Sequence, residues 1–445
     1  MFDYSRSRFE EIARFVLDHA AQIGASAASV DVSEESGLAV TVRKGAVDTL
    51  EQTRDKALGV TVHLGARRGH AATSDFSSLA IREAVRAAYD IARFTGDDEC
   101  GRLPDADRLA RDIPDLDLFH PWMLSTDEAI ALALETEQAA FATDRAIVNS
   151  DGASVSVNHG HFISANSLGF IGGYPFSRHA LSCAPIAGRG RAMQRDDWYS
   201  AARQASKLAD PKALGRYAAE RALSRLGARK LSSRKVPVLF ESPLACGLMG
   251  HFVQAASGGS LYRKASFLLD ALGTQVFAPH LDLHEDPHQP GAFGSQPFDD
   301  EGVATAPRTV VSAGILEGWF LSSYSARKLG LQTTGNAGGA HALRLSSRLT
   351  RPGDDLRAML RALGTGLFVT ELLGHGVNGV TGDYSRGASG YWVEGGEIQY
   401  PVEEITIAGS LPEMFRRIVG VGADEIVRGS RRCGSILIEE MAVGG

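Results

Sequence analysis

The glycine content of the chain changes sharply near residue 229, and this change constrains how the chain can fold. Residues 230–445 hold 32 of the 49 glycines. At 445 residues, the chain also exceeds the length at which a single hydrophobic core keeps growing. We therefore predict two domains, comprising residues 1–229 and residues 230–445, joined through the polar stretch "GARKLSSRK".

Helical and strand-like patterns alternate in the first half. Apolar residues recur at helical spacing in some segments and alternate with polar residues in others, as half-buried strands do. The first half is therefore predicted to be a mixed α/β domain. The predicted helices span about 8–25, 77–94, 125–141 and 211–228, and the predicted strands span 28–35, 38–45, 58–73 and parts of 146–200.

The second half is dominated by strand-like runs, such as "GLFVTELLG" and "GYWVEGGEIQYPVEEITIAG". In the latter run, Gly395 and Gly396 separate two alternating segments and predict a hairpin turn. We therefore predict an α+β fold: a mixed α/β N-terminal domain, then a β-rich C-terminal domain with antiparallel sheets.

Bulk composition limits the function classes. The net charge of -7 argues against a general nucleic-acid or anionic-membrane surface, which would need clustered excess Lys and Arg. No apolar run reaches membrane-spanning length. The four cysteines are widely separated and do not resemble a disulfide framework, so we expect a cytoplasmic protein that binds neither membranes nor nucleic acid.

The stretch "HEDPH" places His284, Glu285 and His288 in the HExxH spacing of zinc peptidases. That motif requires a helix, on which residues four apart share a face. Pro287 disfavours a helix here because it lacks a backbone donor and restricts Asp286. We predict an exposed acidic loop without a metal.

Two further groups of candidate metal ligands are interpreted as structural residues. His159 and His161 share one face of a predicted strand, and we interpret them as surface histidines because two ligands do not complete a metal site. The run "VPVLF" is predicted to be a buried strand that leads into a helix beginning near Pro243. Cys246 and His251 lie on this helix, and we interpret Cys246 as a core residue.

Several long motifs in the second half occur in an order that resembles the TldD/PmbA family, specifically its PmbA (TldE) branch. They include "GGSLYRKASFLLDALG", "SYSARKLGLQTTGNAGG", "GTGLFVTELLGHGVNGVTGDYSRGASGYWVEGG" and "RCGSILIEEM". The resemblance covers residues 230–445, with a looser likeness of layout before them. It implies a subunit of a two-component peptidase that acts with a TldD-type partner on unfolded or modified peptides.

The resemblance also implies where a zinc site would lie. In the TldD branch the helix after the strand carries HExxxH, and a late Cys completes the site. At the corresponding positions this chain has Glu241, Ser242 and Cys246, with Cys433 at or near the late Cys. Two imidazoles are lost, and a serine cannot replace a carboxylate as general base. We therefore expect no metal or cofactor in this chain and zinc in the partner; a thiolate site from Cys246 and Cys433 is the alternative.

The stretch "TGDYSRG" is the predicted peptide-binding lining. Asp383, Tyr384, Ser385 and Arg386 could contact a peptide held by strand addition to an exposed edge of the C-terminal domain. The alternative is a tight turn in which the Asp and the Arg pair with each other.

The resemblance thus favours a PmbA/TldE-type subunit that supplies peptide-binding surface and chamber walls, is inactive alone and forms a homodimer when isolated. Two alternatives stay open: an independent metallopeptidase with an unconventional site, and a noncatalytic peptide-binding scaffold. Metal content and dependence on a partner distinguish the three.

Overall fold

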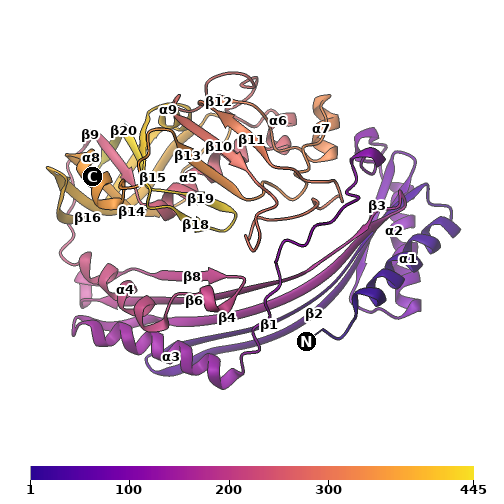
Figure 1. Cartoon of the computed structure of the whole chain (residues 1–445), viewed down its shortest axis with the longest axis horizontal. Helices are drawn as coiled ribbons and strands as arrows, with labels where there is room; N and C mark the ends of the chain where they lie inside the picture. Colours follow the sequence, from indigo (N-terminus) through magenta and orange to yellow (C-terminus); the bar gives the residue numbers. More distant parts are fainter. Residues whose placement is uncertain (1) are drawn as a thin grey trace. The chain divides into compact units, whose positions relative to one another are not determined.

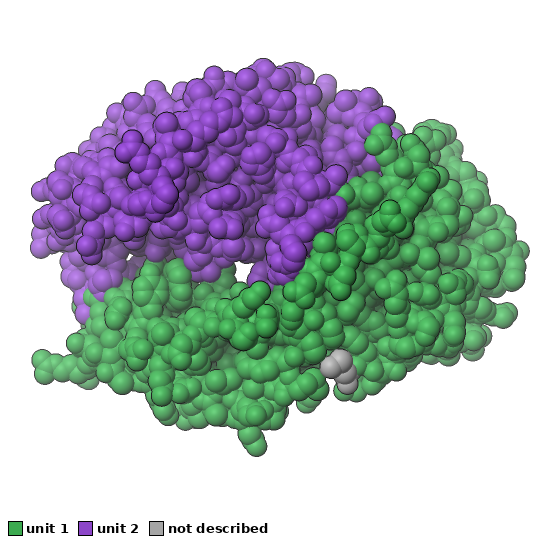
Figure 2. All heavy atoms as spheres, in the orientation of Figure 1, with its two compact units in different colours: residues 1–223, 297–305 green, residues 224–296, 306–445 purple. Residues whose placement is uncertain are grey.

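The protein, described by a computed structural model over residues 2–445, has an α+β fold. The chain divides into two compact units, which Figure 2 shows in different colours. Unit 1 contains the residues up to Leu223 together with Pro297–Thr305. Unit 2 contains Ser224–Gln296 and Ala306–Gly445.

Unit 1 is built on one eight-stranded antiparallel sheet, whose long strands lie side by side in Figure 1. Its strands are β1 (Ala27–Arg43), β2 (Ala46–Leu64), β3 (Arg67–Thr73), β4 (Ile147–Asn166), β5 (Ile171–Gly172), β6 (Pro175–Ala187), β7 (Gln194–Arg195) and β8 (Trp198–Ala202). The main order is β3-β2-β1-β4-β6-β7, with β5 paired to β4 and β8 to β6.

Four α-helices accompany this sheet, and their first turns follow local capping signals. Ser125 accepts a hydrogen bond from the Glu128 amide while the Glu128 carboxylate accepts one from the Ser125 amide, which satisfies two free donors of the helix start. The helices are α1 (Arg6–Gln22), α2 (Ser78–Phe94), α3 (Thr126–Thr143) and α4 (Pro211–Ser224), with 3₁₀ turns at Glu99–Gly101, Ala106–Arg108, Gly190–Ala192 and Ala205–Lys207.

β1 is one continuous strand, so the prediction of two strands over residues 28–35 and 38–45 is wrong at that point. Gly37 does not interrupt the strand. A side chain there would lie 2.6 Å from the Asn158 amide oxygen and 2.8 Å from the Thr53 hydroxyl, on the two neighbouring strands. The glycine therefore permits close packing across the sheet rather than a turn.

The division between the units differs in two respects from the predicted boundary at residue 229. It falls after Leu223, and the segment 297–305 belongs to unit 1 although it lies late in the sequence. Phe298 explains the second difference because its ring packs 5.1 Å from Phe170 and 5.7 Å from Tyr174, centroid to centroid. Local sequence patterns do not reveal such a long-range aromatic contact.

Unit 2 contains two six-stranded sheets, the first with the order β12-β11-β10-β13-β19-β18. The strands of this sheet are β10 (Leu281–Glu285), β11 (Arg308–Ser312), β12 (Ile315–Leu316), β13 (Leu343–Ser347), β18 (Ile426–Arg428) and β19 (Arg431–Cys433).

The second sheet has the order β16-β15-β14-β9-β20-β17, and an additional pairing of β16 with β20 closes it. Gly395 and Gly396 connect β15 to β16 with Glu394 opposite Glu397, which confirms the predicted hairpin. The strands are β9 (Arg234–Phe240), β14 (Gly366–Leu373), β15 (Asp383–Glu394), β16 (Glu397–Ser410), β17 (Ile418–Val421) and β20 (Ile436–Gly444).

The helices of unit 2 are short, apart from the one that follows β9. They are α5 (Ser242–Ala255), α6 (Gly258–Tyr262), α7 (Ser323–Leu329), α8 (Leu356–Leu363) and α9 (Leu411–Arg416). α5 contributes Phe252 and Met249 to the main core of unit 2. Among residues 2–445, no helix has both the length and the apolar character needed to cross a membrane.

Candidate functional site

The start of α5 is fixed by the closed sheet of unit 2. β9 lies between β14, to which it is parallel, and β20. The strand ends where the Glu241 amide donates to the Val369 carbonyl at 3.0 Å, and Pro243 then occupies the first turn of the helix. This confirms the predicted transition from strand to helix. Glu241 and Ser242 are both buried at this junction.

The structure brings Cys246 and Cys433 together. The Cys246 thiol donates to the carbonyl oxygens of Ile426 and Arg431, each at 3.7 Å, and so rests on the hairpin formed by β18 and β19. Cys433 lies on the same hairpin, opposite Ile426, and is fully buried. The two thiols are close enough that a charge on Cys246 would raise the pKa of Cys433.

Burial keeps both thiols in their protonated form. Burial raises the pKa of Cys246 to about 11, although the nearby Arg428 and Arg431 oppose the shift. Complete burial raises the pKa of Cys433 well above its usual value. At neutral pH these groups are protonated packing residues, and a metal that bound them would have to displace their protons.

The positions at which the resemblance implies a TldD-type zinc motif hold Glu241, Ser242 and Cys246, and this set of side chains does not fit a catalytic zinc ion. A catalytic site needs three protein ligands and an open position for water. Within the described part of the chain, no three His, Cys, Asp or Glu side chains gather in a way that could hold a metal ion.

The predicted peptide-binding residues form the beginning of β15 rather than a turn. Asp383 and Ser385 are exposed and Tyr384 is buried, so the four side chains alternate between two faces and do not form one lining. Asp383 accepts from the Thr381 hydroxyl at 2.6 Å, and Arg386 donates to the Leu373 carbonyl at 3.3 Å. The alternative of an Asp–Arg pair in a tight turn is therefore wrong, because the strand directs the two residues to different partners.

Arg431 lies near both Cys246 and His251, and no pattern in the sequence marks it as a candidate site residue. Burial lowers the pKa of His251, and Arg386 and Arg431 lower it further by repulsion. The run "SRRC" contains Arg431, but the structure places its guanidinium against Gly250 of α5 and within electrostatic range of His251. No local pattern links these segments, and only their order in the sheets brings them together.

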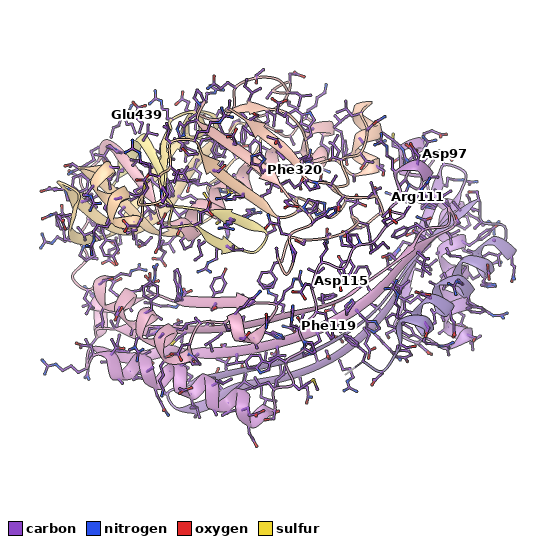
Figure 3. The ribbon with its side chains drawn as sticks, in the orientation of Figure 1. Asp97, Arg111, Asp115, Phe119, Phe320 and Glu439 are labelled. Atoms are coloured by element: carbon purple, nitrogen blue, oxygen red, sulfur yellow. The ribbon has the colours of Figure 1, made fainter. Side chains whose placement is uncertain are left out.

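The HEDPH segment contains the end of a strand and no helix, and Pro287 predicted the absence of the helix. β10 ends at Glu285, and no helix forms, but the prediction of an exposed loop is wrong for Glu285. Its side chain is buried and accepts hydrogen bonds from Arg308 at 2.7 Å and from the Asn336 side chain at 2.8 Å. The Arg308 guanidinium also lies 5.1 Å from the ring centre of Phe320. Phe320 is labelled in Figure 3. Buried partners distant in the sequence give this carboxylate a structural role.

His159 and His161 are buried, so their interpretation as surface residues is wrong. His159 Nε2 accepts from the Trp122 amide at 3.0 Å, and its ring lies 6.1 Å from that of Phe119, which Figure 3 shows against the strands of unit 1. His161 Nε2 lies 3.3 Å from a Glu34 carboxylate oxygen. The segments around Phe119 and the N-terminus cover this part of the sheet, which an alternating strand pattern could not predict.

Comparison with known proteins places the whole chain in one family. The three domains of the PmbA/TldA metallopeptidase family match residues 28–92, 119–226 and 233–445. The chain belongs to the PmbA/TldD metallopeptidase family. This confirms the resemblance seen in the sequence motifs.

The relatives match over nearly their full length. Metalloprotease PmbA of Escherichia coli O157:H7 is 49% identical, over 94% of this chain and 92% of that protein. A Metalloprotease PmbA homolog of Haemophilus influenzae is 46% identical, over 97% and 95%. The crystal structure of TldE from Thermococcus kodakarensis superposes with a TM-score of 0.84 at 18% identity, covering 98% of this chain and 99% of that one, and supports the PmbA/TldD fold.

Glu285 and its neighbour His284 provide a matched test of the HEDPH segment. We expect Glu285→Ala to lower the free energy of unfolding by about 3 kcal/mol, because it leaves the guanidinium of Arg308 without its buried partner. His284→Ala should change it by less than about 0.5 kcal/mol, because that side chain is exposed. Urea denaturation measures both, and equal losses would contradict the assignment.

The buried histidines predict a pH dependence of unit 1. Burial lowers the pKa of His159, His161 and His179 below the ordinary value of 6.5. Below that value the unfolded chain binds protons that the folded unit does not, so stability is present at neutral pH and falls as the pH decreases. The slope is at most about 1.4 kcal/mol per pH unit for each histidine.

Denaturation at pH 7.5, 6.5 and 5.5, followed by tryptophan fluorescence, measures this slope. His159→Gln keeps an acceptor for the Trp122 amide but cannot bind a proton, so we expect a smaller slope. His70→Gln, at an exposed position on β3, is the control and should leave the slope unchanged. Stability of the wild type that is independent of pH in this range would refute the prediction.

Proposed function

We propose that this chain is the PmbA/TldE-type subunit of a cytoplasmic TldD/TldE-type metallopeptidase that processes or degrades unfolded and modified peptides. The chain supplies peptide-binding surface and chamber walls, while a TldD-type partner supplies zinc. Four cysteines that form no disulfide are consistent with a reducing compartment.

The observation that carries this proposal is the chemistry at the start of α5. Glu241, Ser242 and Cys246 stand where the resemblance implies the zinc ligands and general base of a TldD-type chain. The Cys246 thiol is already engaged as a donor to two backbone carbonyls, and its raised pKa keeps it protonated. A chain with this donor set needs a partner for metal-dependent hydrolysis.

Strand addition of a peptide requires a strand with one free edge. In the closed sheet of unit 2, β9, β14 and β15 are paired on both sides. In the other sheet, β18 lies at the end of the strand order, so among the described strands its outer side is unpaired. β18 also lies beside α5 at the position of Cys246. We propose β18 as the edge to which the backbone of the peptide is added.

The register of the β18–β19 hairpin shows which backbone groups are available. Gly429 and Ser430 form the turn, and Arg428 is paired with Arg431. In a two-residue hairpin the closing pair exchanges hydrogen bonds, so the next pair, Val427 with Arg432, does not. The amide and carbonyl of Val427 therefore point toward the free edge.

We also propose that the isolated chain forms a homodimer through β2. Residues 46–57 pair with β1 on one side, whereas β3 pairs only with the later part of β2. This edge is exposed, and it includes the apolar side chains of Val47 and Leu50, each 46% exposed. A second copy related by a two-fold axis would cover the same edge on both chains.

The proposed function predicts the result of a reconstitution experiment. The isolated chain should hold no zinc by elemental analysis and should not hydrolyse a fluorescently labelled unfolded peptide. Added to a zinc-loaded TldD-type partner, it should raise the rate of hydrolysis. Val427→Pro, which removes the outward amide donor, should lower the rate of the assembly about tenfold.

Val427→Thr keeps the amide and a β-branched side chain, so it should behave as the wild type. One tightly bound zinc and partner-free hydrolysis, both lost in Cys246→Ala, would instead establish an independent metallopeptidase. A partner that is fully active without this chain would also refute the proposal.

The β2 edge predicts the state of the isolated chain in solution. Sedimentation at micromolar concentration should show a dimer for the wild type, and the double variant Val47→Asp, Leu50→Asp should shift it toward monomer, because carboxylates would be placed in the apolar contact. A monomeric wild type would show that this edge does not pair.

A further inference from the structure

Two guanidinium groups and one imidazole from separate elements of unit 2 come together around His251. His251 comes from α5, Arg386 from β15 and Arg431 from β19. Arg431 lies against the helix: a side-chain carbon at Gly250 would be 2.8 Å from its Nη1 atom. Burial lowers the pKa of His251, and both guanidinium groups lower it further, so both lie within electrostatic range of the imidazole.

The two guanidinium groups have no acidic ion-pair partner in residues 2–445. Neither Arg386 nor Arg431 forms an ion pair there, and the described hydrogen bond of the Arg386 guanidinium is to the Leu373 carbonyl. The neighbouring Arg432 differs, because its guanidinium pairs with Glu425 at 2.6 Å. Half-buried cations without a counter-charge are unfavourable, and burial accordingly lowers the pKa of Arg431.

Tyr384 adds an unused hydrogen-bond donor to the same group. Its side chain is 1% exposed, and its hydroxyl has no hydrogen-bond partner. The ring lies 6.0 Å from that of His251, and it shares its face of β15 with Arg386. Burial raises the pKa of Tyr384 to about 12, so at neutral pH the hydroxyl keeps its proton and can donate.

We propose that Arg386, Arg431, His251 and Tyr384 form a binding site for a carboxylate group of a peptide. Such a group would supply the missing negative charge and accept hydrogen bonds from the guanidinium groups and the hydroxyl. This inference rests on the proposed peptide-binding function and names the chemical group that unit 2 recognises. The carboxylate can come from the C-terminus of the peptide or from an Asp or Glu side chain.

The position of His251 implies that its imidazole takes up a proton when a carboxylate binds. A bound carboxylate beside the imidazole would favour its protonated form and counteract the repulsion from the two guanidinium groups. Carboxylate binding to the isolated chain should therefore be tighter at pH 6 than at pH 8. The difference should be absent in His251→Gln.

The test compares three short probes by titration calorimetry with the full chain: N-acetyl-trialanine as the free acid, its C-terminal amide, and N-acetyl-Ala-Glu-Ala amide. We expect the free acid to bind about tenfold more tightly than the trialanine amide. Arg386→Gln and Arg431→Gln should each remove this preference. Arg432→Gln is the matched control, because its guanidinium already has a partner, and it should keep the preference.

The outcomes separate this inference from the proposed function. Tighter binding of the Glu-containing amide that depends on Arg386 and Arg431 would support the site and assign it to side-chain carboxylates. Equal binding of all probes, or no binding of any, would overturn the site, whereas the reconstitution experiment would still decide the proposed function. Arginine-dependent binding in a chain that does not assist its partner would retain the site and refute the function.

The Gln variants also require a stability measurement. Removal of an uncompensated charge should leave the unfolding midpoint unchanged or higher. A lower midpoint in both variants, together with lost probe binding, would show that the arginines serve the fold and would overturn the proposal.

Discussion

The pairing of β16 with β20 is the contact on which the arrangement of unit 2 depends. Thr406, Ile407 and Ala408 lie opposite Gly444, Val443 and Ala442, and this short ladder closes the sheet. Closure pairs β16, which would otherwise be an edge of the sheet, and among the described strands leaves β17 with β20 as its one neighbour. β9 lies inside this sheet, between β14 and β20, so that α5 begins at one defined place. The position of Cys246 over the β18–β19 hairpin follows from that start.

The elements around α5 were predictable where a local signal existed. Pro243 after a buried strand marks the helix start, and paired glycines mark the hairpin at residues 395 and 396. Both signals act through the backbone of a few adjacent residues. The continuity of β1 through Gly37 was not predictable, because the reason lies in Asn158 and Thr53 on neighbouring strands.

The charged and polar residues follow the same rule. The sequence predicts Glu285 to be a loop residue, but in the structure it is hydrogen-bonded to Arg308 and Asn336. It predicts His159 to be a surface residue, but in the structure its ring accepts a hydrogen bond from the Trp122 amide. The resemblance correctly indicated the family, but the residues near Cys246 required the strand order. Arg431 belongs to an unremarkable basic run, and only the sheets place it beside His251.

Phe298 has a consequence for how the chain is made. Unit 1 needs this ring against Phe170 and Tyr174, yet the ribosome synthesises it long after Leu223. At roughly 5–20 residues per second, the emerging sheet of unit 1 waits several seconds with an uncovered aromatic surface. During that interval the nascent chain is open to chaperones and to aggregation. Expression of a fragment that stops near residue 229 would make this unfinished state permanent.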